Sequence, residues 1–164
     1  ANPVGPPFTG TEMDVDARAE RAASDPQMQL TSTWGWTKHN TFSSRGGKLV
    51  FYHGVSDPWF SALDTVDYYE RLAKANGGAS AVREWSRLFL VPGMGHCGGG
   101  PATLDTFDML GAVVDWVESG KAPDAVRATG RRWPGRSRPL CPYPTHAHYR
   151  GTGDVEDAAS FECR

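Results

Sequence analysis

Two short apolar runs, each ending in a glycine-containing turn, constrain most strongly what this chain can fold into. Leu49 to Tyr52 precedes the turn Gly54-Val55-Ser56-Asp57-Pro58, and Leu88 to Val91 precedes Gly93-Met94-Gly95-His96-Cys97-Gly98. Short apolar runs bounded by turn residues are typical of strands buried in a parallel sheet. We therefore predict strands over residues 48–53 and 85–91, each followed by a loop that bears one reactive side chain.

Segments with helical spacing follow both predicted strands. Ser61 begins the first predicted helix, which Asn76-Gly77-Gly78 stops, with an apolar stripe of Leu63, Val66, Tyr69 or Glu70, and Ala73. Thr103 is the expected cap of the second helix, with an apolar stripe of Leu104, Phe107, Leu110 or Gly111, Val114 and Val117. This alternation predicts an α/β fold built on a parallel β-α-β-α unit. Two strands are too few to make such a sheet alone.

Asp57 and His96 occupy matching places, each in the loop that leaves a predicted strand. The carboxyl ends of parallel strands lie at one edge of a sheet, so the two loops are expected to meet. There a carboxylate can orient and stabilise an imidazole that takes the proton of a serine. The order acid, then histidine, is that of the last two members of an α/β-hydrolase triad. Taken singly, Asp57 is better explained as a turn former before Pro58, and His96 is explained equally well as a surface loop residue.

The nucleophile of such a triad has no candidate in this sequence. None of the serines stands in G-x-S-x-G or a close variant. Cys97 follows His96 directly, but adjacent residues on an extended loop rarely present their side chains to each other, which argues against a Cys/His pair. We therefore expect the nucleophile to lie outside this chain.

Two other patterns are weaker alternatives for a site. Residues 93–98 match G-x-G-x-x-G, but a dinucleotide site needs a helix directly after the turn and an acid at the end of the next strand, and Pro101 delays the helix. His146 and His148 with Cys141 could suggest zinc, yet their spacing matches no common site. We predict no metal site in this chain.

Three cysteines give an odd count. Cys141 and Cys163 are the expected disulfide, which would close a loop-rich tail that cannot build its own core. That leaves Cys97 as the odd thiol, and in an exported protein it needs a partner elsewhere.

Composition sets broad limits. The chain has 164 residues, 17 basic and 19 acidic side chains and a net charge of −2, which gives no reason to expect nucleic acid or an anionic membrane surface as a partner. The expected organisation is an irregular segment over 1–44, a catalytic-core portion over 45–121, and a loop-rich tail over 122–164 with little regular structure beyond a turn or short helix.

Several of these motifs, in order, resemble the tannase and feruloyl esterase family, which includes the mono(2-hydroxyethyl) terephthalate hydrolases. They are Arg45-Gly46-Gly47-Lys48-Leu49, Tyr52-His53-Gly54-Val55-Ser56-Asp57-Pro58, Thr65-Val66-Asp67-Tyr68-Tyr69-Glu70-Arg71, Val91-Pro92-Gly93-Met94-Gly95-His96-Cys97, Leu140-Cys141-Pro142-Tyr143-Pro144 and Ser160-Phe161-Glu162-Cys163. The resemblance implies the C-terminal portion of an α/β-hydrolase fold with an irregular, disulfide-linked tail. It also implies a secreted or periplasmic serine esterase that cleaves esters of aromatic acids.

The same resemblance assigns roles to individual residues. Asp57 and His96 become the acid and the base, and Cys97 pairs with a cysteine beside the nucleophile. Cys141 with Cys163 matches a second family bridge. The nucleophile segment, the oxyanion hole and most or all of the lid, with its structural calcium, have no counterpart in this sequence. No cofactor is therefore expected in this chain itself.

These expectations combine into one functional hypothesis and one alternative. The chain is predicted to be the acid-and-base-bearing part of a serine carboxylesterase, inactive alone, whose partners are the N-terminal part of the same enzyme and a small aromatic ester. Trp59 is a candidate for the acyl pocket, with core packing as the other interpretation. The alternative is a non-catalytic remnant that binds another protein through its open sheet edge and apolar faces.

Overall fold

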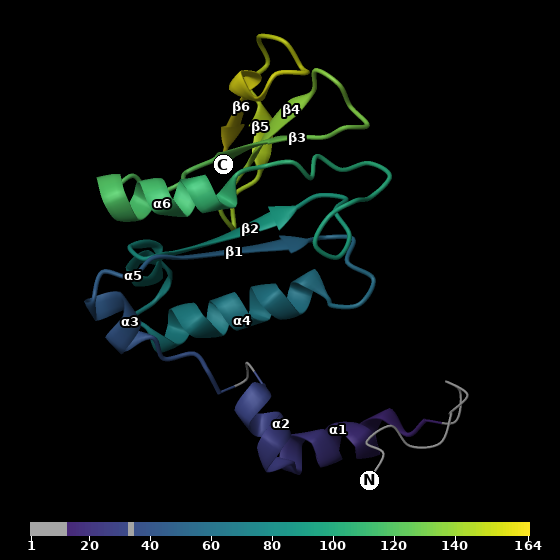
Figure 1. The fold of residues 1–164 in the computed structure, drawn as a ribbon, viewed down its shortest axis with the longest axis vertical. Helices are drawn as coiled ribbons and strands as arrows, with labels where there is room; N and C mark the ends of the chain where they lie inside the picture. The colour runs from purple at the N-terminus through teal and green to yellow at the C-terminus, as the bar shows by residue number, and fades with distance from the viewer. Residues whose placement is uncertain (1–12, 33–34) are drawn as a thin grey trace. The chain divides into compact units, whose positions relative to one another are not determined.

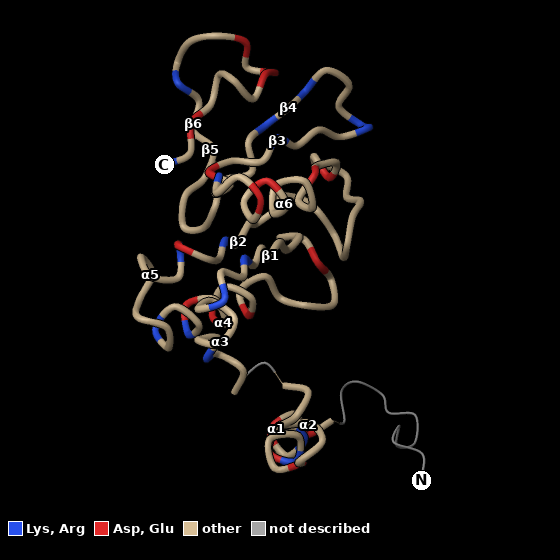
Figure 2. The backbone as a smooth tube through the Cα atoms, turned by 60° about the vertical axis from the view of Figure 1, so that its left-hand side comes forward, with Lys and Arg blue, Asp and Glu red and all other residues tan. Residues whose placement is uncertain are grey.

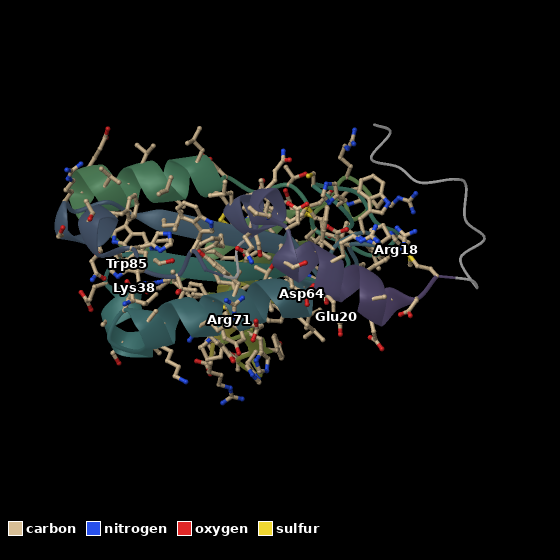
Figure 3. The ribbon with its side chains drawn as sticks, turned by 90° about the horizontal axis from the view of Figure 1, so that it is seen from below. Arg18, Glu20, Lys38, Asp64, Arg71 and Trp85 are labelled. Atoms are coloured by element: carbon tan, nitrogen blue, oxygen red, sulfur yellow. A yellow bond between two sulfur atoms is a disulfide. The ribbon has the colours of Figure 1, made fainter. Side chains whose placement is uncertain are left out.

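The computed structural model describes residues 13–32 and 35–164, which form two compact units divided between Trp36 and Thr37. In the first unit, helix α1 (Val15–Ser24) begins where Asp14 accepts a hydrogen bond from the amide of Ala17, and helix α2 (Pro26–Thr31) follows at once. Pro26 starts α2 because proline fits the first position of a helix. Neither helix buries a residue, and Figure 3 shows Arg18 and Glu20 on α1.

The second unit is built on two parallel strands. Helix α3 (Asn40–Ser44) leads into β1 (Leu49–Gly54), which pairs with β2 (Ser86–Val91) from Leu49 opposite Ser86 to Gly54 opposite Val91. Helices α4 (Ala62–Ala75) and α5 (Ala79–Arg83) connect the two strands. Figure 1 shows α4 on one face of the pair and α6 (Met109–Ser119) on the other. The two predicted strands are thus present within one residue of their expected limits.

Each face of the strand pair has its own apolar cluster. One cluster lies on the side of α4 and α5 and contains Tyr69, Leu72, Val82, Trp85 and Leu88. The other extends from β2 to α6 and the C-terminal strands, and contains Phe89, Val91, Met94, Met109, Val126, Ala128 and Leu140. Successive side chains of β2 therefore enter opposite clusters, as strand geometry requires.

Helix α4 begins and ends where the sequence predicts. Ser61 Oγ accepts a hydrogen bond from the amide of Leu63, and Asn76 ends the helix. The predicted apolar stripe is only partly right. Leu72 is fully buried and Tyr69 nearly so, whereas the Leu63 side chain is 76% exposed. Leu63 belongs to the first turn of the helix, beyond the reach of the cluster that covers its middle.

The start of helix α6 and the face it buries differ from the prediction. Asp108, not Thr103, caps the helix by accepting a hydrogen bond from the amide of Gly111, and residues 103–108 form an irregular segment. Met109 and Trp116 are buried in this helix, while the side chains of the predicted stripe that lie within it are exposed, namely Leu110, Val114 and Val117. Apolar residues surround the helix on nearly every side, so the periodicity did not distinguish its two faces.

The tail contains more regular structure than predicted. Strands β3 (Val126–Thr129) and β4 (Ser137–Leu140) form an antiparallel pair, and so do β5 (Ala147–Tyr149) and β6 (Phe161–Cys163), with a 3₁₀ turn at Ala158–Ser160. The predicted disulfide between Cys141 and Cys163 is present. The tail lies alongside β2, because the amide of Tyr143 donates a hydrogen bond of 2.7 Å to the carbonyl of Leu88.

Acidic and basic side chains are interspersed along the described chain, as Figure 2 shows. In the described ranges, the helices are all too short or too polar to cross a membrane.

Candidate active site

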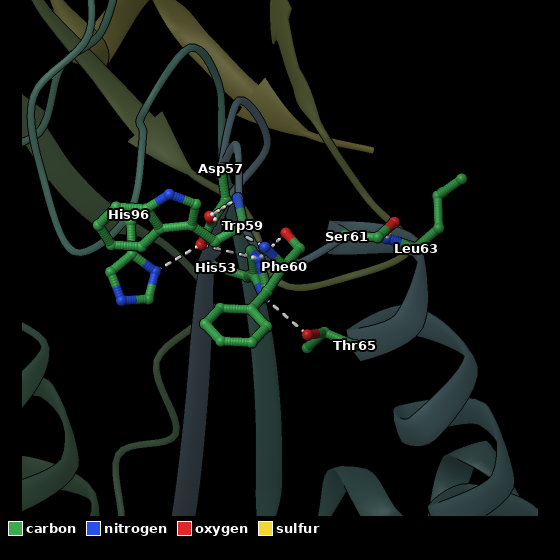
Figure 4. Close-up of polar contacts among 8 residues, drawn as sticks. All are labelled: His53, Asp57, Trp59, Phe60, Ser61, Leu63, Thr65 and His96. Atoms are coloured by element: carbon green, nitrogen blue, oxygen red, sulfur yellow. Dashed lines mark hydrogen bonds and ion pairs between the residues drawn. The ribbon is translucent and has the colours of Figure 1, made fainter. Parts of the chain in front are cut away.

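The parallel pairing of β1 and β2 brings the two predicted site residues into contact. Asp57 lies in the loop after β1 and His96 in the loop after β2. Nδ1 of His96 lies 2.8 Å from Oδ2 of Asp57, a hydrogen-bond distance, although 39 residues separate them in the sequence (Figure 4). Because a carboxylate only accepts hydrogen bonds, this contact places the proton of a neutral His96 on Nδ1.

A glycine permits the close approach of the two loops. Gly54 ends β1, and a Cβ atom at this position would collide with the carbonyl oxygens of Met94 and Gly95 in the histidine loop. The amide of Ser56 donates to the same Met94 carbonyl over 2.9 Å. A larger residue at Gly54 would therefore separate the acid from the histidine.

The Asp57 carboxylate is held by its own loop as well as by His96. Its Oδ1 accepts hydrogen bonds from the amides of Trp59, at 2.8 Å, and Phe60, at 3.1 Å. Burial alone raises the pKa of this carboxyl, but these amides and His96 outweigh it and lower the pKa of Asp57 from 3.8 to about 2. Asp57 is therefore ionised at neutral pH.

Two aromatic rings pack against the His96 imidazole. The ring centroids of Trp59 and Phe60 lie 4.7 Å and 5.4 Å from that of His96, and Figure 4 shows both rings beside it. Trp59 is 72% exposed, so it does not pack in the core. The His96 side chain is 34% exposed, and its Nε2 makes no hydrogen bond within the described ranges. This nitrogen is free to take a proton from a group outside them.

A second histidine, not predicted as a site residue, lies at this site. His53, near the end of β1, lies with its Nδ1 2.7 Å from the hydroxyl of Thr65 and its Nε2 3.2 Å from the carbonyl of Phe60. Its position in the motif before Gly54 was the available signal.

The two alternative sites lack the geometry that a dinucleotide or a zinc ion requires. No helix follows the G-x-G-x-x-G turn directly, because α6 starts only at Met109, so the geometry of a dinucleotide site is absent from this segment. Cys141 is bound in its disulfide. Within residues 13–32 and 35–164, no three His, Cys, Asp or Glu side chains gather as metal ligands would.

Cys97 is a free, exposed thiol in the structure. Its backbone has a φ of 60°, in the left-handed region that residues with a side chain rarely adopt. The histidine loop thus holds the residue after His96 in a defined conformation. No described cysteine pairs with it.

Comparisons with known proteins identify relatives of this chain. The chain is 48% identical over 164 residues to the mono(2-hydroxyethyl) terephthalate hydrolase of Piscinibacter sakaiensis, covering 93% of this chain and 26% of that protein. It is 37% identical over 139 residues to feruloyl esterase B of Aspergillus niger, covering 74% of this chain and 27% of that protein. The chain therefore spans about a quarter of the length of these relatives.

Solved structures give the same result. The crystal structure of feruloyl esterase B from Aspergillus oryzae matches with a TM-score of 0.74 and 28% identity, covering 96% of this chain and 34% of that one. Tannin acyl hydrolase from Aspergillus niger matches with a TM-score of 0.66 and 26% identity, over 90% of this chain and 27% of that one. The tannase and feruloyl esterase family model matches residues 8–164. This chain belongs to the tannase and feruloyl esterase family.

Proposed function

We propose that this chain is the acid-and-base-bearing part of a serine carboxylesterase that hydrolyses esters of aromatic acids, with its nucleophilic serine outside the chain. The observation that carries this proposal is the 2.8 Å contact between His96 Nδ1 and Asp57 Oδ2. It leaves Nε2 of His96 unprotonated and directed away from the carboxylate, as a general base requires.

The reaction follows from these positions. His96 Nε2 removes the proton of the serine hydroxyl as the serine oxygen bonds to the ester carbonyl carbon, and Asp57 stabilises the resulting imidazolium. Collapse of the tetrahedral intermediate breaks the ester bond, and the imidazolium gives its proton to the leaving alcohol. In the second half of the reaction, His96 removes a proton from water as the water oxygen bonds to the acyl carbon. The imidazolium then returns this proton to the serine oxygen, and the acid is released.

The relatives support the substrate class. Their names specify feruloyl esters, tannins and mono(2-hydroxyethyl) terephthalate. We propose that this chain serves an ester of the same aromatic kind. The exposed ring of Trp59 beside His96 would then contact the aromatic acyl group.

The partner that completes the site is proposed to be the nucleophile-bearing part of the same enzyme. Cys97, free and exposed one residue after His96, is placed to form a disulfide with a cysteine near the serine. The Cys141–Cys163 bond supports folding in an oxidising compartment, so we propose a secreted or periplasmic location. In this proposal, the chain portion described is the C-terminal part of an α/β-hydrolase fold.

Hydrolysis of methyl ferulate and of mono(2-hydroxyethyl) terephthalate tests the proposal. The chain is assayed alone and joined to the nucleophile-bearing part of the Piscinibacter sakaiensis relative. We expect no turnover by the chain alone, and activity in the chimera that His96→Ala lowers roughly 10⁴-fold or more. His148→Ala, on β5, is the matched control. Ester turnover by the chain alone that survives His96→Ala would contradict the proposal.

A protein-binding module without catalysis is the second candidate. Exposed apolar side chains on α6 favour it, because Leu110, Val114 and Val117 are 73%, 40% and 60% exposed. A chimera that folds and binds but has no His96-dependent esterase activity would favour this candidate. Intact mass without reductant shows whether Cys97 holds a second chain.

A further inference from the structure

We propose that His53 is a positioning residue, which holds the acid loop so that Asp57 and His96 stay in register. The proposal rests on the proposed function, because it assigns His53 a role in the same site. His53 is largely buried, with 14% of its side chain exposed, and it joins three segments, namely β1, the acid loop and the first turns of α4 (Figure 4).

The contacts of His53 define its protonation pattern. The Phe60 carbonyl can only accept a hydrogen bond, so Nε2 of His53 carries the proton and donates over 3.2 Å. In the neutral ring, Nδ1 then accepts from the Thr65 hydroxyl over 2.7 Å. Both ring nitrogens are therefore engaged, which fixes the ring and the backbone it holds.

Phe60 transmits this restraint to the catalytic pair. Its carbonyl accepts from His53, its amide donates to Oδ1 of Asp57 over 3.1 Å, and its ring packs against His96. Phe60 thus contacts His53, Asp57 and His96. Loss of the His53 bond would free the Phe60 peptide, and with it one of the two amides that orient the carboxylate.

His53 does not compete with His96 for the carboxylate. Its Nε2 lies 3.6 Å from Oδ2 of Asp57, beyond hydrogen-bond range, while His96 lies at 2.8 Å from the same oxygen. The structure therefore gives the two histidines different tasks. His96 is the proton carrier, and His53 holds the loop that presents the acid.

Two substitutions separate the two bonds of His53. In His53→Gln, the terminal amide reaches the position of Nε2 and can still donate to Phe60. In His53→Asn, the shorter amide reaches only the position of Nδ1, so it keeps the Thr65 contact and loses Phe60. If the Phe60 bond is the important one, glutamine preserves the site and asparagine does not.

The tautomer of His96 is the direct readout. Nitrogen-15 shifts of the histidine rings, recorded near pH 8 where an ordinary imidazole is neutral, distinguish a proton on Nδ1 from one on Nε2. The measurement uses the chain as it is and needs no activity. The set comprises the wild type, Asp57→Asn, His53→Ala, His53→Asn, His53→Gln and the remote control His148→Ala, with circular dichroism to verify folding.

We expect His96 to carry its proton on Nδ1 in the wild type, His53→Gln and His148→Ala, and to shift towards Nε2 in His53→Ala and His53→Asn. If His53→Ala does not fold, the asparagine and glutamine variants supply the same comparison. A response to Asp57→Asn with none to His53→Ala or His53→Asn overturns this inference and leaves the proposed function intact. No Nδ1 tautomer in the wild type would overturn both.

Kinetics of the active chimera give a second, independent readout. Misplacement of a catalytic group by about 1 Å can cost on the order of 10²-fold in rate. We therefore expect His53→Asn to lower kcat roughly 10- to 100-fold with little change in KM, and His53→Gln to restore most of the loss. Equal kcat in the two variants would overturn the role of the Phe60 bond.

Discussion

The hydroxyl of Tyr143 donates a hydrogen bond of 2.6 Å to Oε1 of Glu70, and so joins the C-terminal tail to helix α4. The Tyr143 ring also packs edge-on against Tyr69 within the cluster under that helix. The hydrogen bond to the Glu70 carboxylate, with some burial, raises the pKa of the Tyr143 phenol. The tail is therefore anchored on the α4 side of the sheet as well as along β2.

Tyr143→Phe should destabilise the chain modestly. The variant keeps the ring packing and removes only the hydrogen bond, so we expect a loss of about 0.5–1 kcal/mol in the free energy of unfolding. Urea denaturation measures this loss. Tyr149→Phe, which removes a hydroxyl bonded to the Gly153 carbonyl within the tail, is the matched control, and only Tyr143→Phe should remove the contact between tail and helix.

Leu72→Ala should be severely destabilising. Leu72 of α4 is fully buried, whereas Leu63 on the same helix is 76% exposed. Removing a buried leucine side chain costs about 2–5 kcal/mol, while an exposed substitution stays within about 0.5 kcal/mol. Similar unfolding midpoints for Leu72→Ala and Leu63→Ala would show that the cluster around Leu72 does not stabilise the fold.

Asp57 should stabilise the folded chain at neutral pH, and this contribution should be lost in acid. Its pKa falls from 3.8 to about 2 on folding, so between these values the native state binds fewer protons than the unfolded state. The contribution is complete above pH 3.8 and is lost as the pH falls through about 2. We expect unfolding free energies measured from pH 5 to pH 2 to fall less steeply for Asp57→Asn than for the wild type. Asp115→Asn, on α6, controls for the loss of one negative charge.

The Cys141–Cys163 disulfide should stabilise the chain substantially. The bond spans 22 residues of sequence, and closing a loop of that length is worth about 3 kcal/mol in the chain-entropy model. The double variant Cys141→Ser/Cys163→Ser should show that loss in thermal and urea unfolding. Cys97→Ser, at the free thiol, should unfold like the wild type. Equal stability of the wild type, the double variant and Cys97→Ser would mean that the tail folds without the disulfide.

The positions of Asp57 and His96 could be predicted because parallel strands end at one edge. Asp57 and His96 each follow one of the two apolar runs, and these runs form β1 and β2, which pair in parallel. The contacts of His53 and Phe60 could not be predicted, although the position of His53 directly before Gly54 was a signal. Their contacts depend on how the acid loop folds back on β1, and the Phe60 contribution comes largely from its backbone atoms.

The errors in the prediction have a common physical origin. In α6 the sequence Met109 to Val117 is apolar on several sides, so tertiary contacts and not periodicity selected Met109 and Trp116 for burial. The tail over 122–164 is predicted to contain little regular structure, yet Pro139 lies within β4 opposite Arg127. Proline can be accommodated in such a short edge ladder, because it removes only one donor.

The packing of Trp59 and Phe60 against His96 also limits how the imidazole can turn. A half-turn of the ring about its Cβ–Cγ bond would exchange Nδ1 for a carbon and break the contact with Asp57, and it would disturb the packing against both neighbouring rings. The histidine therefore meets its reaction partner with most of its rotational freedom already lost. In the proposed reaction, the entropy of orienting the base would be lost when the chain folds and would not have to be lost again in each catalytic cycle.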